Sequence, residues 1–94
     1  MTSDEILEII QDELEKSGAI KPKGLLCSPV KLTSKTEGEE LWLVYEEVLS
    51  NGAKGYAIFY DEQEEIFAFG EYDEEDGYEL DGYRDDFLST LYGL

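Results

Sequence analysis

The stretch Gly70–Asp86 (GEYDEEDGYELDGYRDD) holds the densest group of side chains in this chain that could do chemistry. Carboxylates dominate it, and Arg84 is its only base. Carboxylates can coordinate a cation, transfer protons in catalysis, or pair with the lysines and arginines of a basic partner. The residues around the carboxylates decide among these three kinds of site.

The spacing of the glycines excludes a calcium loop of the EF-hand type. That loop needs acids or amides at positions one, three and five, glycine at six and glutamate at twelve. With Gly77 at position six, Tyr72 and Tyr83 fall at positions one and twelve, and with Gly82 at six, position one is a glycine. We therefore expect no metal site, although a weak cation site at Asp73–Asp76 stays open.

Catalysis is not expected from this composition. The chain has no histidine, which removes the usual general base, the Ser-His and Cys-His pairs and most zinc sites. Cys27 is the only cysteine, so no intramolecular disulfide can form, and its apolar surroundings are typical of a small core residue. Two carboxylates could hydrolyse a glycoside, but among 24 acids any pair is uninformative. We predict a protein that is not an enzyme and has no cofactor.

The charge of the chain narrows the choice of partner. Its 94 residues include 24 acids and 7 bases, which gives a formal net charge of −17. Solubility or adaptation to salt could explain this charge, and so could electrostatic steering toward a cationic surface. Direct binding of nucleic acid is disfavoured because phosphates would meet carboxylates. No apolar run is long enough for a bilayer, the N-terminus is acidic, and the lone cysteine fits a reducing compartment, so we expect a cytoplasmic protein.

A protein-binding surface is the kind of site that remains. Tyrosines lie between the acids of Gly70–Asp86 and supply rigid contact area of the kind favoured at binding hot spots. The candidate partner-binding residues are Tyr72, Asp73, Glu74, Glu75, Asp76, Tyr78, Glu79, Asp81 and Tyr83. The competing interpretation is a solvated loop, with Tyr78 and Tyr83 packed against the final helix. A second candidate surface is the acidic face of the first helix, around Glu8, Asp12 and Glu15.

A helix is predicted over Thr2–Ser17. Thr2 and Glu5 have the spacing of a capping box, and Gly18 is a stop signal. The apolar residues recur at intervals of three and four, which indicates one buried stripe of Ile6, Leu7, Ile10 and Leu14.

About four strands follow, predicted over Leu25–Thr33, Leu41–Leu49, Gly55–Tyr60 and Glu65–Tyr72. Pro29 cannot donate to a ladder, so it places the first strand at a sheet edge or at a bulge. Asn51-Gly52 is a strong hairpin signal. Alternation in the second strand predicts one face with Trp42, Val44 and Val48 and another with Leu41, Leu43 and Tyr45.

A short final helix is predicted over Asp85–Leu91, with Asp85 as its cap and an apolar side made by Phe87, Leu88 and Leu91. Gly70–Asp86 then connects the last strand to this helix, and Gly70 marks a bulge or a close backbone approach. The short connections favour an antiparallel meander over parallel crossovers. We therefore expect a single α+β domain over residues 1–94.

The run GYAIFYDEQEEIFAFGEYDEEDGYELDGYRDDFLSTLYGL combines a tyrosine-rich hairpin, a polar turn, a strand with Phe-Gly, and a Gly-Tyr entry to a short final helix. In these features it resembles the C-terminal halves of small acidic immunity proteins encoded beside bacterial toxins. The resemblance covers about the last forty residues. The resemblance implies that the protein is a toxin inhibitor, but it assigns a binding role to no individual residue.

The leading hypothesis is an immunity protein that neutralises a basic partner, foremost a nuclease toxin, by offering carboxylates where the toxin expects phosphates. One alternative is a phage-type DNA mimic that blocks a restriction or CRISPR effector, for which the charges should spread along a face at phosphate-like spacing. Another alternative is a non-inhibitory acidic adaptor domain. The oligomeric state stays open, because an exposed strand containing Pro29 could pair between chains.

Overall fold

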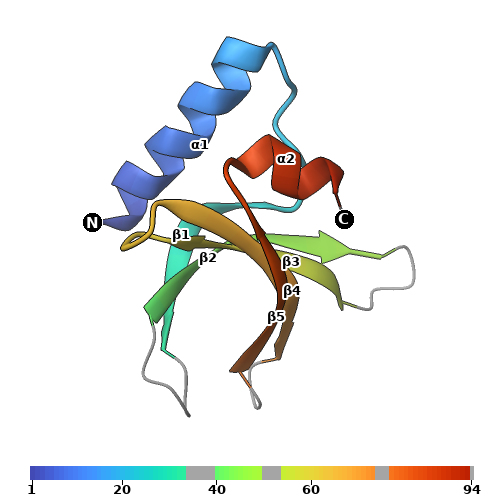
Figure 1. The fold of residues 1–94 in the computed structure, drawn as a ribbon. Coiled ribbons are helices and arrows are strands. Elements are labelled where there is room, and N and C mark those ends of the chain that lie inside the picture. The colour runs from blue at the N-terminus through green and yellow to red at the C-terminus, as the bar shows by residue number, and fades with distance from the viewer. Residues whose placement is uncertain (34–39, 50–53, 74–76, 94) are drawn as a thin grey trace.

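The computed structural model describes residues 1–33, 40–49, 54–73 and 77–93, with the backbone alone at 48, 54 and 73. The elements are α1 (Ser3–Ser17), β1 (Leu25–Thr33), β2 (Glu40–Val48), β3 (Lys54–Asp61), β4 (Ile66–Asp73), β5 (Gly77–Arg84) and α2 (Phe87–Tyr92). The strands form one antiparallel sheet in the order β1-β2-β3-β4-β5, and both helices lie on one side of it (Figure 1). The predicted α+β architecture is confirmed, except that the sheet has five strands.

Local sequence signals determine both ends of α1, as predicted. Thr2 Oγ1 accepts from the backbone N–H of Glu5 at 3.3 Å, and Glu5 Oε1 accepts from the N–H of Thr2 at 3.0 Å, which completes the capping box. Gly18 ends the helix with φ 66°, a left-handed conformation that suits glycine. The buried side chains of α1 are Ile6, Ile10 and Leu14.

β1 lies at an edge of the sheet, as Pro29 predicted. Its pairing with β2 is irregular between Leu25 and Val30, the segment that contains the proline. Cys27 is exposed on this strand, so the expectation of a core cysteine is wrong. The predicted hairpin turn at Asn51-Gly52 falls outside the described residues, but β2 and β3 pair antiparallel as such a turn requires.

Gly77–Arg84 forms a fifth strand, and the prediction that this segment belongs to a connector is wrong. It pairs with β4 over a register that runs from Phe67 opposite Arg84 to Asp73 opposite Gly77. Glycine and acidic residues are poor strand formers, so the composition of β5 concealed it. The predicted close approach at Gly70 is confirmed, because a Cβ there would overlap the carbonyl oxygen of Glu79.

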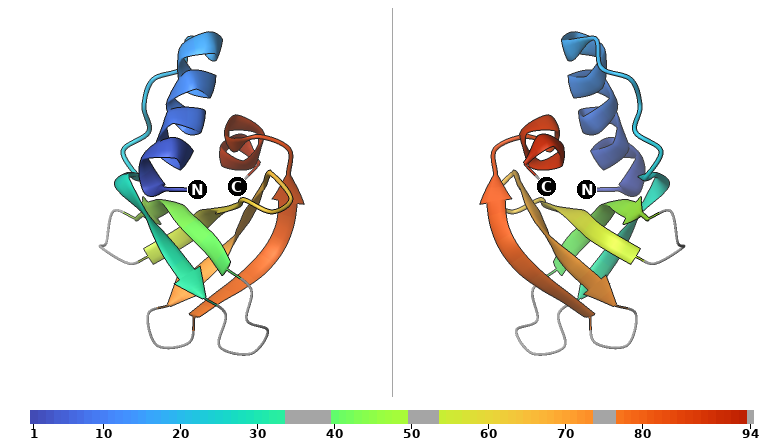
Figure 2. Two further views of the ribbon diagram at one scale, coloured as in Figure 1. Left: turned by 90° about the vertical axis from the view of Figure 1, so that its left-hand side faces the viewer. Right: turned by 90° about the vertical axis from the view of Figure 1, so that its right-hand side faces the viewer.

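The sheet is curled, with both helices on one side of it (Figure 2). Apolar residues form one cluster on each of its faces. The helix-side cluster joins the sheet to both helices and contains Ile6, Ile10, Leu14, Leu25, Trp42, Val44, Tyr45, Ile58, Tyr60, Phe67 and Phe87. The far-face cluster contains Leu41, Leu43, Ala57, Phe59 and Ala68. Neither of the two described helices covers the far face. Partly buried side chains from β1, β4 and β5 pack on it, namely Leu26, Leu32, Tyr72, Tyr78 and Leu80.

Two finer predictions are wrong for local reasons. Tyr45 shares the helix side with Val44, because the register with β3 shifts between Leu43 and Tyr45 and this irregularity breaks the alternation. The cap of α2 is Asp86 and not Asp85, since Asp86 Oδ1 accepts from the N–H of Ser89 at 2.7 Å.

Candidate protein-binding surface

The predicted partner-binding residues are only partly within the described structure. Glu74, Glu75 and Asp76 fall outside it, and Asp73 ends β4 with its side chain not described. The remaining five lie on β4 and β5. The weak cation site considered at 73–76 therefore falls outside the described side chains as well.

The tyrosines of the predicted site belong to the far face of the sheet. Tyr72 and Tyr78 are opposite each other and pack on the far-face cluster, where the ring of Tyr78 lies 5.5 Å from that of Phe59 between centroids. Tyr83 lies opposite Ala68 and is 48% exposed. Since opposite residues share a face, Tyr83 also points to the far side. The expected alternative, packing of Tyr78 on the final helix, does not occur.

The acids of β5 point to the other face. Glu79 lies opposite Glu71, and each of them is next in the chain to one tyrosine of the Tyr72–Tyr78 pair. Because successive side chains in a strand alternate between faces, both glutamates point away from the far face. Asp81 is the extra residue where the register slips between Phe69 and Gly70, and it lines a hollow together with Phe69. Phe67 belongs to the helix-side cluster, and Phe69 follows two positions later on the same side. Among the side chains that the structure describes, the pleat thus places Glu79 and Asp81 on the face opposite to the predicted tyrosines.

A hollow of about 320 Å³ opens on the helix side of the sheet, and we call it the Tyr56 hollow. It is lined by Tyr56, Phe69, Asp81 and Gly93, from three strands and the end of α2. Tyr56 is 41% exposed. The guanidinium of Arg84 lies over the Phe69 ring, 5.2 Å from its centroid. Two aromatic rings and a carboxylate here border a single space.

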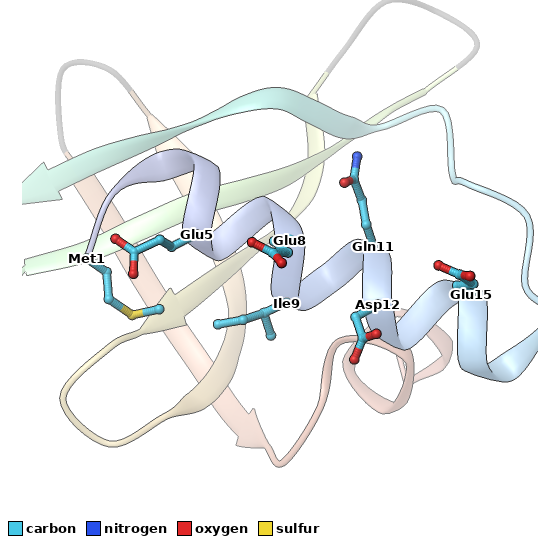
Figure 3. A pocket seen from close by; sticks show the side chains of 7 residues that line it. All are labelled: Met1, Glu5, Glu8, Ile9, Gln11, Asp12 and Glu15. Atoms are coloured by element: carbon cyan, nitrogen blue, oxygen red, sulfur yellow. The ribbon is translucent and has the colours of Figure 1, made fainter.

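A second hollow, of about 580 Å³, lies on the side of α1 turned away from the sheet (Figure 3). Its acids are Glu5, Glu8, Asp12 and Glu15, which we call the α1 acidic face. Ile9 lies among them and is 36% exposed. Lys16 is the base nearest along the helix, and its Nζ pairs with Asp12 at 2.9 Å. Three of these acids form the second surface that the sequence indicated.

Two other carboxylates are already engaged within the fold. Glu13 accepts from the backbone N–H groups of Phe87 and Leu88 at the start of α2. Glu62 accepts from the N-terminal ammonium at 2.9 Å and from Trp42 Nε1 at 3.4 Å, with Lys31 Nζ at 3.9 Å. The hydrogen bond from the ammonium lowers the pKa of Glu62, and partial burial acts in the opposite direction. These acids stabilise the fold and are not available to a partner.

Sequence reasoning did not select Tyr56 or Phe69. Each reads as an ordinary strand aromatic, and only the register of three strands brings them together beside Asp81. Asp81 follows Glu79 to the helix side by ordinary alternation, and the extra residue in β5 then turns Gly82 and Arg84 to the side of Phe69 as well, which no sequence pattern predicts. The Phe-Gly pair at Phe69 and Gly70 was the nearest available signal.

Within the described ranges, no group of three or more His, Cys, Asp or Glu side chains is placed to hold a metal ion. The helices found there include none with the length and apolar character needed to cross a membrane. No protein-family model, curated protein or solved structure gives a significant match to the chain.

Proposed function

We propose that the protein is an acidic inhibitor of the immunity type, which binds a basic protein and occludes its cationic surface. A nuclease toxin is the proposed partner, because carboxylates can take the positions of the phosphates that a nuclease binds. The α1 acidic face carries this proposal: four carboxylates and the exposed Ile9 line one hollow.

The α1 acidic face contains like charges at close spacing, which Lys16 offsets at Asp12. Glu8 and Asp12 are four residues apart, and like charges at that spacing destabilise a helix by about 0.2–0.5 kcal/mol. A basic partner relieves this repulsion on binding, whereas water and salt only screen it. Ile9 supplies exposed apolar area beside the carboxylates, and protein interfaces combine apolar area with polar surroundings.

The number of charges on α1 does not by itself distinguish an inhibitor fitted to one partner from a DNA mimic. From Glu5 to Glu15 the helix rises about 15 Å, at 1.5 Å per residue. One strand of B-DNA carries about four phosphates over that length, at one per 3.4 Å, and the α1 acidic face offers four carboxylates there. The exposed Ile9 beside them supports the inhibitor, because a phosphate backbone has no apolar side chain at such a position.

Glu79 and Asp81 remain candidates for the same interface, since both are exposed on β5. Tyr72 and Tyr78 are less suited to the predicted role of anchors, because they pack on the far-face cluster. An anchor must offer accessible area to a partner.

The test is capture of the partner from a lysate of the organism that encodes the chain, with elution by a salt gradient. Three baits are compared: the unchanged protein, Glu8→Lys with Glu15→Lys, and a control with Glu64→Lys and Asp85→Lys. Both double variants move the formal charge from −17 to −13, since each substitution adds two units. All four positions are exposed.

We expect the unchanged and control baits to retain the same basic protein at low salt and the α1 variant to lose it. The purified partner should then show nuclease activity that the unchanged protein inhibits. Recovery of no basic protein, or equal retention by all three baits, contradicts the proposal that α1 forms the interface.

A further inference from the structure

The Tyr56 hollow has the composition of a site for a cationic side chain. Its volume of about 320 Å³ lies at the small end of the range of about 300–1,000 Å³ typical of ligand pockets. Tyr56 and Phe69 supply aromatic rings, and aromatic faces attract cations through their quadrupole. Asp81 supplies a carboxylate at the same space.

The geometry around Arg84 shows that this location accepts a guanidinium. The Arg84 guanidinium lies over the Phe69 ring at 5.2 Å and donates to the carbonyl oxygen of Tyr83 at 3.2 Å. It lies beside Gly93, another residue of the hollow. Phe69 therefore already takes part in the kind of contact that an incoming arginine would make.

Asp81 and Arg84 are close in sequence but do not pair. Within the described residues, neither side chain takes part in an ion pair. Arg84 is directed to Phe69 and Gly93, and the carboxylate of Asp81 is left at the hollow. In a chain with a formal charge of −17, Asp81 can take a cation from outside without breaking an internal pair.

We propose that the Tyr56 hollow receives an arginine side chain of the basic protein partner. The guanidinium pairs with Asp81, and its stem and planar face lie against Tyr56 and Phe69. Arginine suits the site better than lysine, because its planar group both stacks on a ring and binds a carboxylate through two donors. This inference rests on the proposed function, since it names the chemical group by which that partner is held.

The test uses N-acetyl-arginine amide as the probe, titrated into the ¹⁵N-labelled protein and followed by amide chemical shifts. N-acetyl-citrulline amide is the neutral probe of the same shape, and N-acetyl-lysine amide tests the preference for arginine. Asp81→Asn is compared with Asp85→Asn, which removes one charge from an exposed position outside the hollow. Tyr56→Leu removes a ring, and Arg84→Gln removes the neighbouring like charge.

With the arginine probe we expect saturable changes in amide chemical shift, centred on Gly82 and Gly93. The lysine probe should change the same signals less, and the citrulline probe should leave them unchanged. Asp81→Asn and Tyr56→Leu should each weaken binding about twofold to fivefold, the range expected for exposed ion pairs and cation–π contacts. Asp85→Asn should leave the affinity unchanged. Arg84→Gln should tighten binding, because it removes a repulsive charge.

Shifts spread evenly over the acidic surface, or equal effects of Asp81→Asn and Asp85→Asn, would overturn the proposal. Weaker binding in Arg84→Gln would also overturn it, since Arg84 would then support binding of the cationic probe where the proposal requires it to repel the probe. Any of these results removes the arginine site while leaving the capture experiment on α1 free to succeed, so the two proposals can fail separately.

Discussion

Glu13 and Leu88 join the two helices: Glu13 Oε2 accepts from the backbone N–H of Leu88 at 2.6 Å, while its Oε1 accepts from the N–H of Phe87 at 3.0 Å. The first N–H groups of a helix have no partner within the helix, and a helix as short as α2 is not stable alone. A carboxylate on α1 thus supplies the N-terminal hydrogen bonds of α2, together with the capping side chain of Asp86. The contact fixes α2 above the sheet, where Phe87 joins the helix-side cluster.

Glu13→Ala should lower the free energy of unfolding by about 1–2 kcal/mol, because it leaves two partly buried N–H groups without their acceptor. Urea denaturation measures this change, and amide exchange should accelerate at Phe87 and Leu88. Glu15→Ala is the matched control on the exposed face, where a change within about 0.5 kcal/mol is expected. Equal effects of the two substitutions would show that the α1–α2 contact contributes nothing to stability.

Gly70→Ala should destabilise the pairing of β4 with β5. A Cβ at this position would overlap Glu79 O and lie 2.9 Å from Leu80 Cα, and backbone atoms cannot move aside as a flexible side chain can. Forced overpacking of this kind costs about 1–3 kcal/mol, and we expect the upper end of that range. The measurement is hydrogen exchange, which should accelerate in β5 more than in β2 and β3. Unchanged protection in β5 would mean that the two strands have room for a side chain between them.

Most of the fold could be predicted from local signals, and β5 shows where they fail. The capping box of Thr2 and the end of α1 at Gly18 depend on neighbouring residues alone, so both can be predicted directly from the sequence. β5 depends on tertiary contacts: Tyr78 and Leu80 pack on the far-face cluster and hold a strand that is otherwise acidic and rich in glycine. Packing overrides strand propensity in such a segment, and propensity alone indicates a loop.

The candidate site was predictable in composition but not in geometry. The sequence shows which segments are acidic, and it indicated both β5 and α1. It does not show that the pleat turns Glu79 and Tyr78 to opposite faces, because this requires knowing that the segment is a strand. The one-residue slip in register then turns Tyr83 to the far face and Arg84 to the side of Phe69, so the contact of Arg84 with the Phe69 ring appears only in three dimensions.

Glu62→Gln should reduce stability at neutral pH, with a difference from the unchanged protein that shrinks in acid. Hydrogen bonds from the N-terminal ammonium and from Trp42 Nε1 favour the charged form and lower the pKa of Glu62 from its ordinary 4.5. A carboxylate whose folded pKa is depressed contributes stability above its unfolded pKa and loses it as the pH falls through the folded pKa.

The measurement is the urea midpoint of both proteins from pH 7 downward, with Trp42 fluorescence as the signal. The two midpoints should differ at neutral pH and converge as the pH falls through the lowered pKa of Glu62 in the folded state. Glu64→Gln, in the same turn but exposed, serves as the control. A difference that grows as the pH falls would contradict the assigned direction of the pKa shift.

Glu8→Lys with Glu15→Lys should make the free protein more stable while weakening its binding to a basic partner. Position 8 is exposed, so a lysine there disturbs no core contact, and it attracts Asp4 and Asp12, each four residues away. At position 15 a lysine also interacts favourably with the C-terminal end of the helix dipole. Each relieved pair contributes about 0.2–0.5 kcal/mol, so the urea midpoint should rise and the rise should diminish in high salt. A stabilised variant that still binds the partner would show that the charge of α1 serves another purpose than binding.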